Sequence, residues 1–166
     1  MNVPDAIAHL VPSLFDSDEK PLYAQAATTA PDGAPNVRTV HVRYLQSADA
    51  LCFACHVESP KWRELQSNSR IAACWFHPKR QIQLRWHANA TLITDRDHPA
   101  VQTSWEQTHE WIQKEYGDGS FFGVVVLAIT SWDFYEIDLT DPSKSRRRVW
   151  ILDGKNWREE SRQTLK

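Results

Sequence analysis

Alternation of apolar and polar residues dominates the chain and predicts a protein built mainly of β-strands. The strand-like runs cover residues 22–29, 36–45, 51–56, 71–76, 81–94, 121–129, 132–139, 147–152 and 157–161. Short turns join many of these runs: Pro31-Asp32-Gly33 favours a tight turn, and Asp153-Gly154 is a strong hairpin signal. Several short strands with turns of this kind are typical of an antiparallel β-barrel.

Three stretches have the apolar period of a helix instead. The first covers residues 5–14, and its apolar face would consist of Ile7, Leu10, Val11 and Leu14. Ser59-Pro60-Lys61 opens the second, because Ser is a favoured N-cap and Pro fits the first helical position; this helix ends at Asn68. The third spans roughly residues 99–116. Since no repeat or linker interrupts the pattern, we expect one domain over residues 1–166, a β-barrel with appended helices.

Composition and charge narrow the class of protein. The chain has 166 residues, 42% hydrophobic and 24% charged, with a formal net charge of −2. These values are ordinary for one globular domain, and they leave no broad basic surface for nucleic acid. Residues 1–15 lack the features of a secretory signal, and no apolar run reaches about 18 residues. We therefore expect a cytoplasmic protein with no nucleic-acid or membrane partner.

Cys52 and Cys55 have the C-x-x-C spacing of many zinc sites. They fall inside a predicted strand, where positions i and i+3 point to opposite faces, so one metal ion cannot bind both. We expect buried core cysteines and no metal site. The chain also lacks the HExxH, GxSxG, GxxxxGK[ST] and GxGxxG motifs, which removes the usual support for acyl transfer, nucleotide hydrolysis and Rossmann-type binding.

Basic side chains gather along one stretch of the sequence. Arg38 and Arg43 share a predicted strand, and Lys61 lies at the start of the second helix, beside Ser59. A helix N-terminus offers unpaired N–H groups and the positive end of a dipole, so it binds phosphate readily. The pattern predicts a phosphate-bearing ligand here; the alternative is a capped surface helix beside two solvated arginines.

Two further groups of polar residues interrupt apolar strands. Gln83 and Arg85 lie on a strand otherwise rich in Ile, Leu and Trp, and a Gln amide suits the edge of a flavin or pteridine ring because it both donates and accepts. The run 146–148 is all arginine and follows the aromatic pair Phe134-Tyr135. An exposed strand face and a solvated charge run are the alternatives.

The order of these segments resembles the pyridoxamine 5′-phosphate oxidase-like family of FMN-binding split barrels. The resemblance covers about residues 22–157. It rests on the segments P-N-V-R-T-V-H-V-R, F-A-C-H-V-E-S-P-K-W-R-E-L, I-A-A-C-W-F, Q-L-R-W-H-A, W-D-F-Y and D-G-K-N-W. Each segment is weak alone, and their order and spacing together are specific.

This resemblance implies a homodimer of split barrels with FMN at the subunit interface. Arg38 and Lys61 would contact the FMN phosphate, Gln83 would reach the flavin, and Tyr135 with Arg147 or Arg148 would act from the other subunit. The full set of expected cofactor-binding residues is Arg38, Thr39, Val40, His41, Arg43, Cys55, Ser59, Lys61, Gln83, Tyr135 and Arg147.

The chain also departs from the family pattern. Where the family has the sequence F-Y-T, this chain has Phe53-Ala54-Cys55. Ala88 replaces a glycine that is common in the family, and Pro60 replaces a basic residue. The residues that hold substrate phosphate in the family's true oxidases, and their R-L-H stretch, have no counterpart. The resemblance therefore supports FMN binding more strongly than oxidation of pyridoxamine phosphate.

The resulting hypothesis is an FMN-dependent oxidoreductase acting on a small molecule, with no catalytic side chain assigned. A reduced nicotinamide or a small amine is the expected electron donor. The alternative is a non-catalytic barrel that carries FMN or haem, for which the axial ligand would be His41, His56 or His87. A dimeric structural protein without a ligand is the third possibility.

Overall fold

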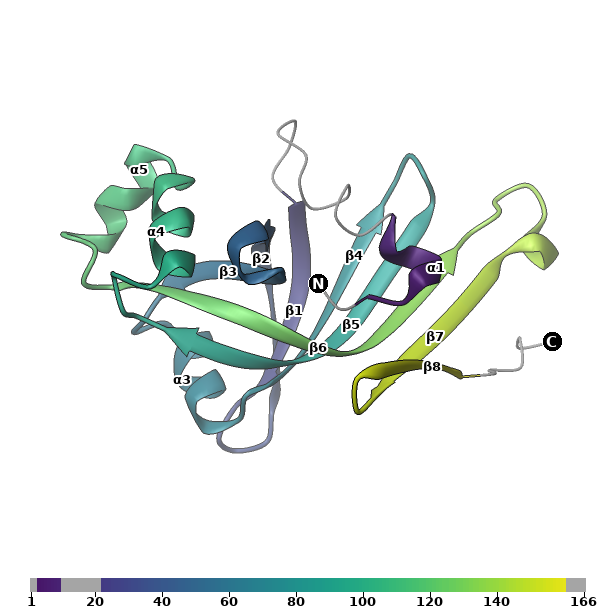
Figure 1. Cartoon of the computed structure of the whole chain (residues 1–166), viewed down its shortest axis with the longest axis horizontal. Helices are drawn as coiled ribbons and strands as arrows, with labels where there is room; N and C mark the ends of the chain where they lie inside the picture. Colours follow the sequence, from purple (N-terminus) through teal and green to yellow (C-terminus); the bar gives the residue numbers. More distant parts are fainter. Residues whose placement is uncertain (1–2, 10–21, 161–166) are drawn as a thin grey trace.

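Eight antiparallel strands form one sheet in residues 3–9 and 22–160, the part of the chain that the computed structural model describes. Their bounds are Leu22–Thr29 (β1), Pro35–Leu45 (β2), Ala50–His56 (β3), Arg70–His77 (β4), Ile82–Ile93 (β5), Phe122–Glu136 (β6), Arg146–Asp153 (β7) and Asn156–Glu160 (β8). The order across the sheet is β3-β2-β1-β4-β5-β6-β7-β8, and β3 also pairs with β6. That pairing closes β1 to β6 into a six-stranded barrel, and β7 and β8 extend the sheet beyond it (Figure 1). The prediction of a mainly β fold, a barrel with appended helices, is confirmed.

One long strand replaces the two strands predicted over residues 121–129 and 132–139. β6 runs for 15 residues without a break. Its pairing with β5 shifts register between His87 and Ala88, where Ser131 and then Ile129 are the partners. A bulge of this kind bends a strand and increases its twist without ending it, so the polar Thr130-Ser131 pair marks an irregularity inside β6.

The helices are short, and most of them pack against the sheet. They are Asp5–Ala8 (α1), Pro60–Ser67 (α3), Glu110–Gln113 (α5) and Pro99–Glu106 (α4), with 3-10 turns at Gln46–Ala48 (η1), Lys114–Tyr116 (η2) and Pro142–Lys144 (η3). α3 begins and ends where the sequence predicts. Positions 10–14 of the first predicted helix lie outside the described residues. Within the described part of the chain, no helix is both long and apolar enough to cross a membrane.

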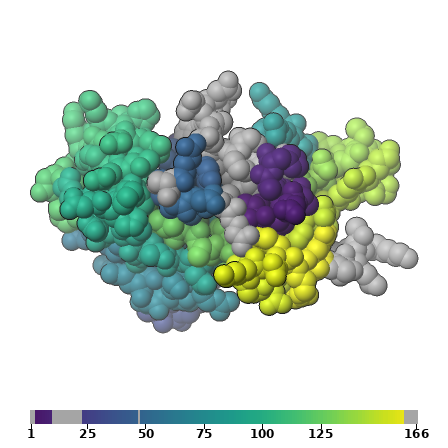
Figure 2. All heavy atoms as spheres, in the orientation of Figure 1, coloured from purple at the N-terminus to yellow at the C-terminus, as the bar shows by residue number. Residues whose placement is uncertain are grey.

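The continuous helix predicted over residues 99–116 is wrong. The chain leaves the helix after Glu106 and re-enters it at Glu110. Thr108 is buried at this break, and its hydroxyl donates to the backbone oxygen of Ser104 at 2.7 Å. Side-chain bonds of this type compete with the regular helical ladder, which explains why apolar periodicity alone overestimates the helix. The resulting α4–α5 lobe forms one end of the molecule in the space-filling view (Figure 2).

The apolar core consists of two clusters on opposite sides of the barrel wall. The larger cluster fills the barrel and includes Trp86 and Trp132, whose ring centroids lie 5.9 Å apart. The smaller cluster lies between α4 and the outer surface of β3 and β6. Cys55 belongs to the first cluster and Cys52 to the second. The prediction that these two cysteines are buried and point to opposite faces is confirmed.

Close packing against β6 holds α3 in place. Trp62 is buried on the inner side of α3, and its indole lies directly over Gly123. A Cβ atom at position 123 would lie 2.4 Å from the indole Cζ3 and 2.9 Å from Cγ1 of Val57. These distances are too short for any real Cβ contact, so the absence of a side chain at position 123 allows α3 to approach the barrel.

The fold predicts that Gly123→Ala destabilises the protein by about 1–3 kcal/mol, because overpacking displaces the indole of Trp62. Urea unfolding monitored by circular dichroism measures the change. In Trp62→Phe the two closest indole atoms, Cζ3 and Cη2, are removed. The double variant should therefore lose less stability than the two single variants lose together. Additive losses would contradict this account of the contact.

Candidate functional site

The start of α3 is the first place where predicted site residues meet. Ser59 occupies the N-cap position in an extended conformation, and Pro60 is the first helical residue. The Ser59 hydroxyl makes no capping bond. It is buried and has no nitrogen or oxygen partner among the described residues. Its neighbour is the buried Cys55 thiol, which comes from the end of β3.

Three neighbouring side chains influence the pKa of the Cys55 thiol. Burial raises the pKa of the thiol, while the positive charge of Lys61, the Ser59 hydroxyl and the positive charge of Arg38 act in the opposite direction. Arg38 of β2 is bonded to Glu64 of α3, and Ser59 and Lys61 lie at the start of that helix beside Cys55 of β3. The three elements thus bring Arg38, Cys55, Ser59 and Lys61 together. We call these four residues the α3 group.

A buried carboxylate holds Arg38 within the α3 group. Arg38 Nη2 lies 2.8 Å from Oε2 of Glu64, and Nη1 donates to the Thr28 hydroxyl. Glu64 also accepts a bond from Thr28, and another from Asn36 Nδ2 at 2.7 Å. Burial alone would raise the pKa of Glu64, but these hydrogen bonds and the Arg38 charge outweigh it and hold the pKa below its ordinary value. Glu64, which sequence reasoning missed, is therefore an anion in the folded protein.

Successive residues of β2 point to opposite faces of the sheet, so the predicted site residues on this strand fall into an inward-facing set and an outward-facing set. Val40 is buried inside the barrel, on the same side as Arg38. Thr39 lies on the outer face and accepts a bond from Gln25 Nε2 at 3.1 Å. His41 and Arg43 also face outward, with Nδ1 and Nη2 separated by 3.4 Å. Thr39, His41 and Arg43 therefore do not join the α3 group.

His41 lies in an environment that disfavours its charged form. Burial is the largest cause, followed by the positive charges of Arg43 and His109, and together they lower the pKa of His41 to about 4. The imidazole is therefore neutral near pH 7. The same burial lowers the pKa of Arg43 from its ordinary value, although Cys52 acts in the opposite direction.

The remaining predicted residues meet on the outer face of β5, β6 and β7. Gln83 is paired with Tyr135 across β5 and β6, and Tyr135 is paired with Arg147 across β6 and β7. We call these three residues the sheet group. Arg148 points to the other face, where it pairs with Glu159 at 2.7 Å and lies over Trp150. Arg147, rather than Arg148, therefore shares the face of Gln83 and Tyr135.

Asp133 anchors the sheet group and was also missed from sequence. Its carboxylate accepts bonds from Arg85 and from Nε and Nη2 of Arg147, the latter two at 2.9 and 2.6 Å. Burial opposes ionisation, yet the bonds from Arg147 and Arg85 prevail and lower the pKa of Asp133. Two guanidinium groups thus share one carboxylate, which leaves a net positive charge beside a hollow of about 510 Å³. Volumes of this size are typical of small-molecule sites.

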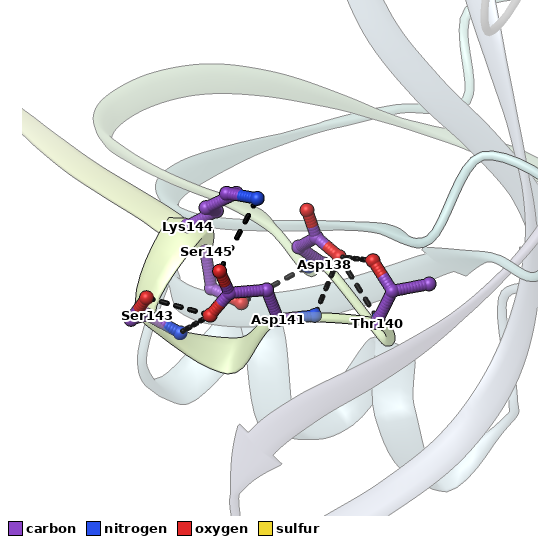
Figure 3. Close-up of polar contacts among 6 residues, drawn as sticks. All are labelled: Asp138, Thr140, Asp141, Ser143, Lys144 and Ser145. Atoms are coloured by element: carbon purple, nitrogen blue, oxygen red, sulfur yellow. Dashed lines mark hydrogen bonds and ion pairs between the residues drawn. The ribbon is translucent and has the colours of Figure 1, made fainter.

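The loop that joins β6 to β7 is held by its own polar side chains (Figure 3). Asp138 accepts three bonds, from the hydroxyl and N–H of Thr140 and from the N–H of Asp141. Asp141 in turn accepts from Ser143 and pairs with Lys144 at 3.2 Å. These bonds lower the pKa of both aspartates. The loop therefore has a defined shape without an apolar core and leads directly into the arginines of β7.

Gln81, just before β5, has an unusual backbone. Its φ of 55° lies in the left-handed region that few non-glycine residues adopt. Its carbonyl accepts the Ile137 N–H at 2.9 Å, which ties the start of β5 to the loop after β6. Gln81 and Arg146 both line an open hollow of about 710 Å³ beside that loop. Because strained backbone gathers at functional sites, Gln81 is a second glutamine of interest beside Gln83.

The three histidines considered as axial ligands are each engaged by the protein. His56 makes stacked ring contacts with Phe121 and Tyr116, with centroid separations of 4.8 and 6.1 Å. Its Nδ1 accepts the Glu58 N–H, and Nδ1 of His87 lies 3.1 Å from the Ser131 hydroxyl. In residues 3–9 and 22–160, no three His, Cys, Asp or Glu side chains are grouped to hold a metal ion.

The α3 group and the sheet group lie at opposite ends of β6. Cys55 is paired with Gly123 at the start of that strand, whereas Tyr135 lies at its end. A strand rises by about 3.3 Å per residue, so roughly 40 Å of β6 separates the two positions. Within one chain the two groups do not meet.

A family model described as pyridoxamine 5′-phosphate oxidase matches residues 16–136. The chain belongs to this family. Two curated relatives are the pyridoxine/pyridoxamine 5′-phosphate oxidases of Rhodopseudomonas palustris, 36% identical over 92 residues, and Bradyrhizobium diazoefficiens, 35% identical over 94 residues. Both matches cover 54% of this chain and 43% of the relative, so the chain matches less than half the length of these enzymes.

Solved structures confirm the split-barrel fold. A pyridoxamine 5′-phosphate oxidase-related, FMN-binding protein from Nostoc punctiforme has a TM-score of 0.78 at 24% identity, over 96% of this chain and 95% of the other. PhzG from Burkholderia lata has a TM-score of 0.69 at 16% identity, over 96% and 92%. HutZ, a haem storage protein from Vibrio cholerae, has 0.53 at 18% identity, over 72% and 89%. At these identities the likeness establishes the fold alone.

The low pKa of His41 predicts that the stability of the protein falls as pH drops from about 6.5 to 4. In this window the unfolded chain binds a proton at His41 that the folded chain does not bind, so unfolding is favoured. Because His41 is only half-buried, we expect about 1–2 kcal/mol rather than the full value of the shift. Urea unfolding at pH 4.5 and 7 measures the difference.

His41→Gln should remove this part of the pH dependence. His87→Gln changes an exposed histidine on β5 and is the matched control, which should follow the wild-type profile. An unchanged slope in His41→Gln would show that other groups cause the loss of stability.

Proposed function

We propose that this protein binds FMN and acts as an FMN-dependent oxidoreductase on a small molecule. The observation that carries the proposal is the α3 group, in which two cations and the buried hydroxyl of Ser59 surround the start of a helix. This hydroxyl has no nitrogen or oxygen partner among the described residues, and the Cys55 thiol beside it is only a weak acceptor. A phosphate group would accept a hydrogen bond from this hydroxyl and form ion pairs with both cations.

The residues present fit the phosphate of FMN. Arg38 has five N–H donors, of which two are used in bonds to Thr28 and Glu64, so three remain. Lys61 adds a mobile point charge, and the first turn of α3 adds backbone N–H groups. Ser59 adds its hydroxyl. Bound FMN would supply hydride chemistry, while the protein supplies position and charge.

The sheet group fits the ring portion of the cofactor. The Gln83 amide both donates and accepts, Tyr135 offers an aromatic ring, and Arg147 is held in place by Asp133. Arg147 and Arg85 place positive charge on the outer face, where it would stabilise an anionic ring or substrate. A reduced nicotinamide or a small amine is the expected donor.

We further propose that two copies of the chain pair so that each FMN contacts the α3 group of one and the sheet group of the other. The support is that the two groups lie at opposite ends of β6 and make no described contact with each other within one chain. A homodimer brings them together without any change in the fold, because a two-fold interface repeats each contact. The FMN-binding protein from Nostoc punctiforme, with the same fold over nearly its whole length, is consistent with this proposal.

Removing the two cations by Arg38→Ala with Lys61→Ala should weaken FMN binding at least about 100-fold, since each charge-assisted bond contributes about 1.5–3 kcal/mol. Titration of FMN fluorescence measures the affinity. Arg63→Ala removes an exposed cation from the same helix and is the matched control, with a change of about twofold or less. Lys61→Ala alone tests the proposal if the double variant fails to fold, with an expected loss of about tenfold.

An unchanged affinity in these variants would refute the phosphate assignment. The visible spectrum of the wild-type protein separates the alternatives at the same time. A flavin spectrum on adding FMN supports the proposal. A Soret band on adding haem, without flavin binding, would instead support the haem alternative suggested by likeness to HutZ.

Complementation tests the shared site. A chain with Arg38→Ala and Lys61→Ala is co-expressed with a differently tagged chain that carries Tyr135→Ala and Arg147→Ala. The mixed dimer should bind one FMN per two chains, because one of its two sites receives intact groups from both subunits. Each variant alone should bind weakly. No recovery in a mixed dimer that has formed, as shown by tandem affinity purification, would refute the shared site.

A further inference from the structure

Glu64 brings a negative charge into a group of residues proposed to hold a phosphate. Only 5% of this residue is exposed, and it lies on the inner face of α3. Its carboxylate contacts β1 through Thr28 and β2 through Asn36 and Arg38. An acidic residue in such a place is unexpected, since FMN phosphate itself carries between one and two negative charges near pH 7.

The hydrogen bonds alone do not explain the choice of a carboxylate. Thr28 and Asn36 are neutral, and an amide oxygen at position 64 would accept bonds from Thr28 and Arg38 in the same geometry, although the bond from Arg38 would lose its ionic part. The amide nitrogen would then face Asn36, whose own side-chain amide can turn its oxygen toward it. The distinctive property of Glu64 is therefore its charge, which lies 2.8 Å from the guanidinium of Arg38.

That charge reduces the field available to a ligand phosphate. Arg38 and Lys61 contribute two positive charges to the α3 group, and Glu64 cancels one of them. Interactions between buried charges are weakly screened, so the carboxylate repels a phosphate bound on the far side of the same guanidinium. A ligand without phosphate does not experience this repulsion.

Resting on the FMN-binding function proposed above, we propose that Glu64 determines how strongly the site discriminates phosphorylated from unphosphorylated flavin. It acts as an internal counter-anion for Arg38: it orients the guanidinium and balances its charge when no ligand is bound. In doing so it lowers the preference for FMN over riboflavin. Glu64 is thus a specificity-determining residue that acts through Arg38 and need not touch the cofactor.

The test compares the dissociation constants of FMN and riboflavin, both measured by fluorescence titration. Glu64→Gln should raise the ratio of the riboflavin constant to the FMN constant about tenfold, because binding of the phosphate improves while binding of the ring is unchanged. Glu58→Gln makes the same charge change at an exposed position just before Ser59. This control should change the ratio by about twofold or less, since solvent screens its charge.

The ratio distinguishes a charge effect from structural damage, because damage to the site would weaken the binding of both ligands by a similar factor. A ratio that stays constant or falls in Glu64→Gln overturns the inference while leaving FMN binding intact. If the wild-type protein fails to bind FMN, both the proposed function and this inference are refuted. Glu64→Asp, the second variant in case Glu64→Gln does not fold, keeps the charge but withdraws it from Arg38. The ratio should then rise by a smaller factor, and an unchanged ratio again overturns the inference.

Discussion

The unbroken pairing of β6 is the constraint on which the rest of the structure depends. Its first half hydrogen-bonds to β3 and closes the barrel, while its second half continues past the barrel to pair with β7. Closure removes two exposed sheet edges and buries the indoles of Trp86 and Trp132. The same continuity places the α3 group and the sheet group at opposite ends of one strand. In the proposed dimer, a site that uses both groups would therefore draw them from two chains.

A carboxylate orients the arginines of both the α3 group and the sheet group. Glu64 holds Arg38, and Asp133 holds Arg85 together with Arg147. Guanidinium groups lose less entropy on binding when their orientation is already fixed, and a carboxylate fixes it through directional bonds. The cost is partial neutralisation of the charge that a ligand would otherwise meet. The two groups differ in this respect, because Asp133 serves two arginines and leaves a net positive charge, whereas Glu64 balances Arg38 alone.

Most of the fold could be predicted from the sequence because it depends on local patterns. Alternation of apolar residues identifies the strands, and Ser59 with Pro60 marks the start of α3. Glu64 and Asp133 could not be found in this way, since their importance comes from partners on other strands or helices that alternation does not reveal. The choice between Arg147 and Arg148 also depended on cross-strand register. The break after α4 escaped prediction because one buried hydroxyl, that of Thr108, overrides apolar periodicity.

Two features of helix α3 act in the same direction at the α3 group. Pro60 occupies a position where the resemblance leads us to expect a basic residue, and Glu64 adds a negative charge on the inner face of the same helix. Pro60 suits the first turn of a helix, so the helix start and its backbone N–H groups are preserved while one side-chain charge is lost. The geometry for a phosphate is thus retained while its electrostatic attraction is reduced. In the proposed site, shape and hydrogen bonding would therefore contribute more to FMN binding than they would beside an uncompensated pair of cations, and the Glu64 carboxylate would set the size of the charge contribution.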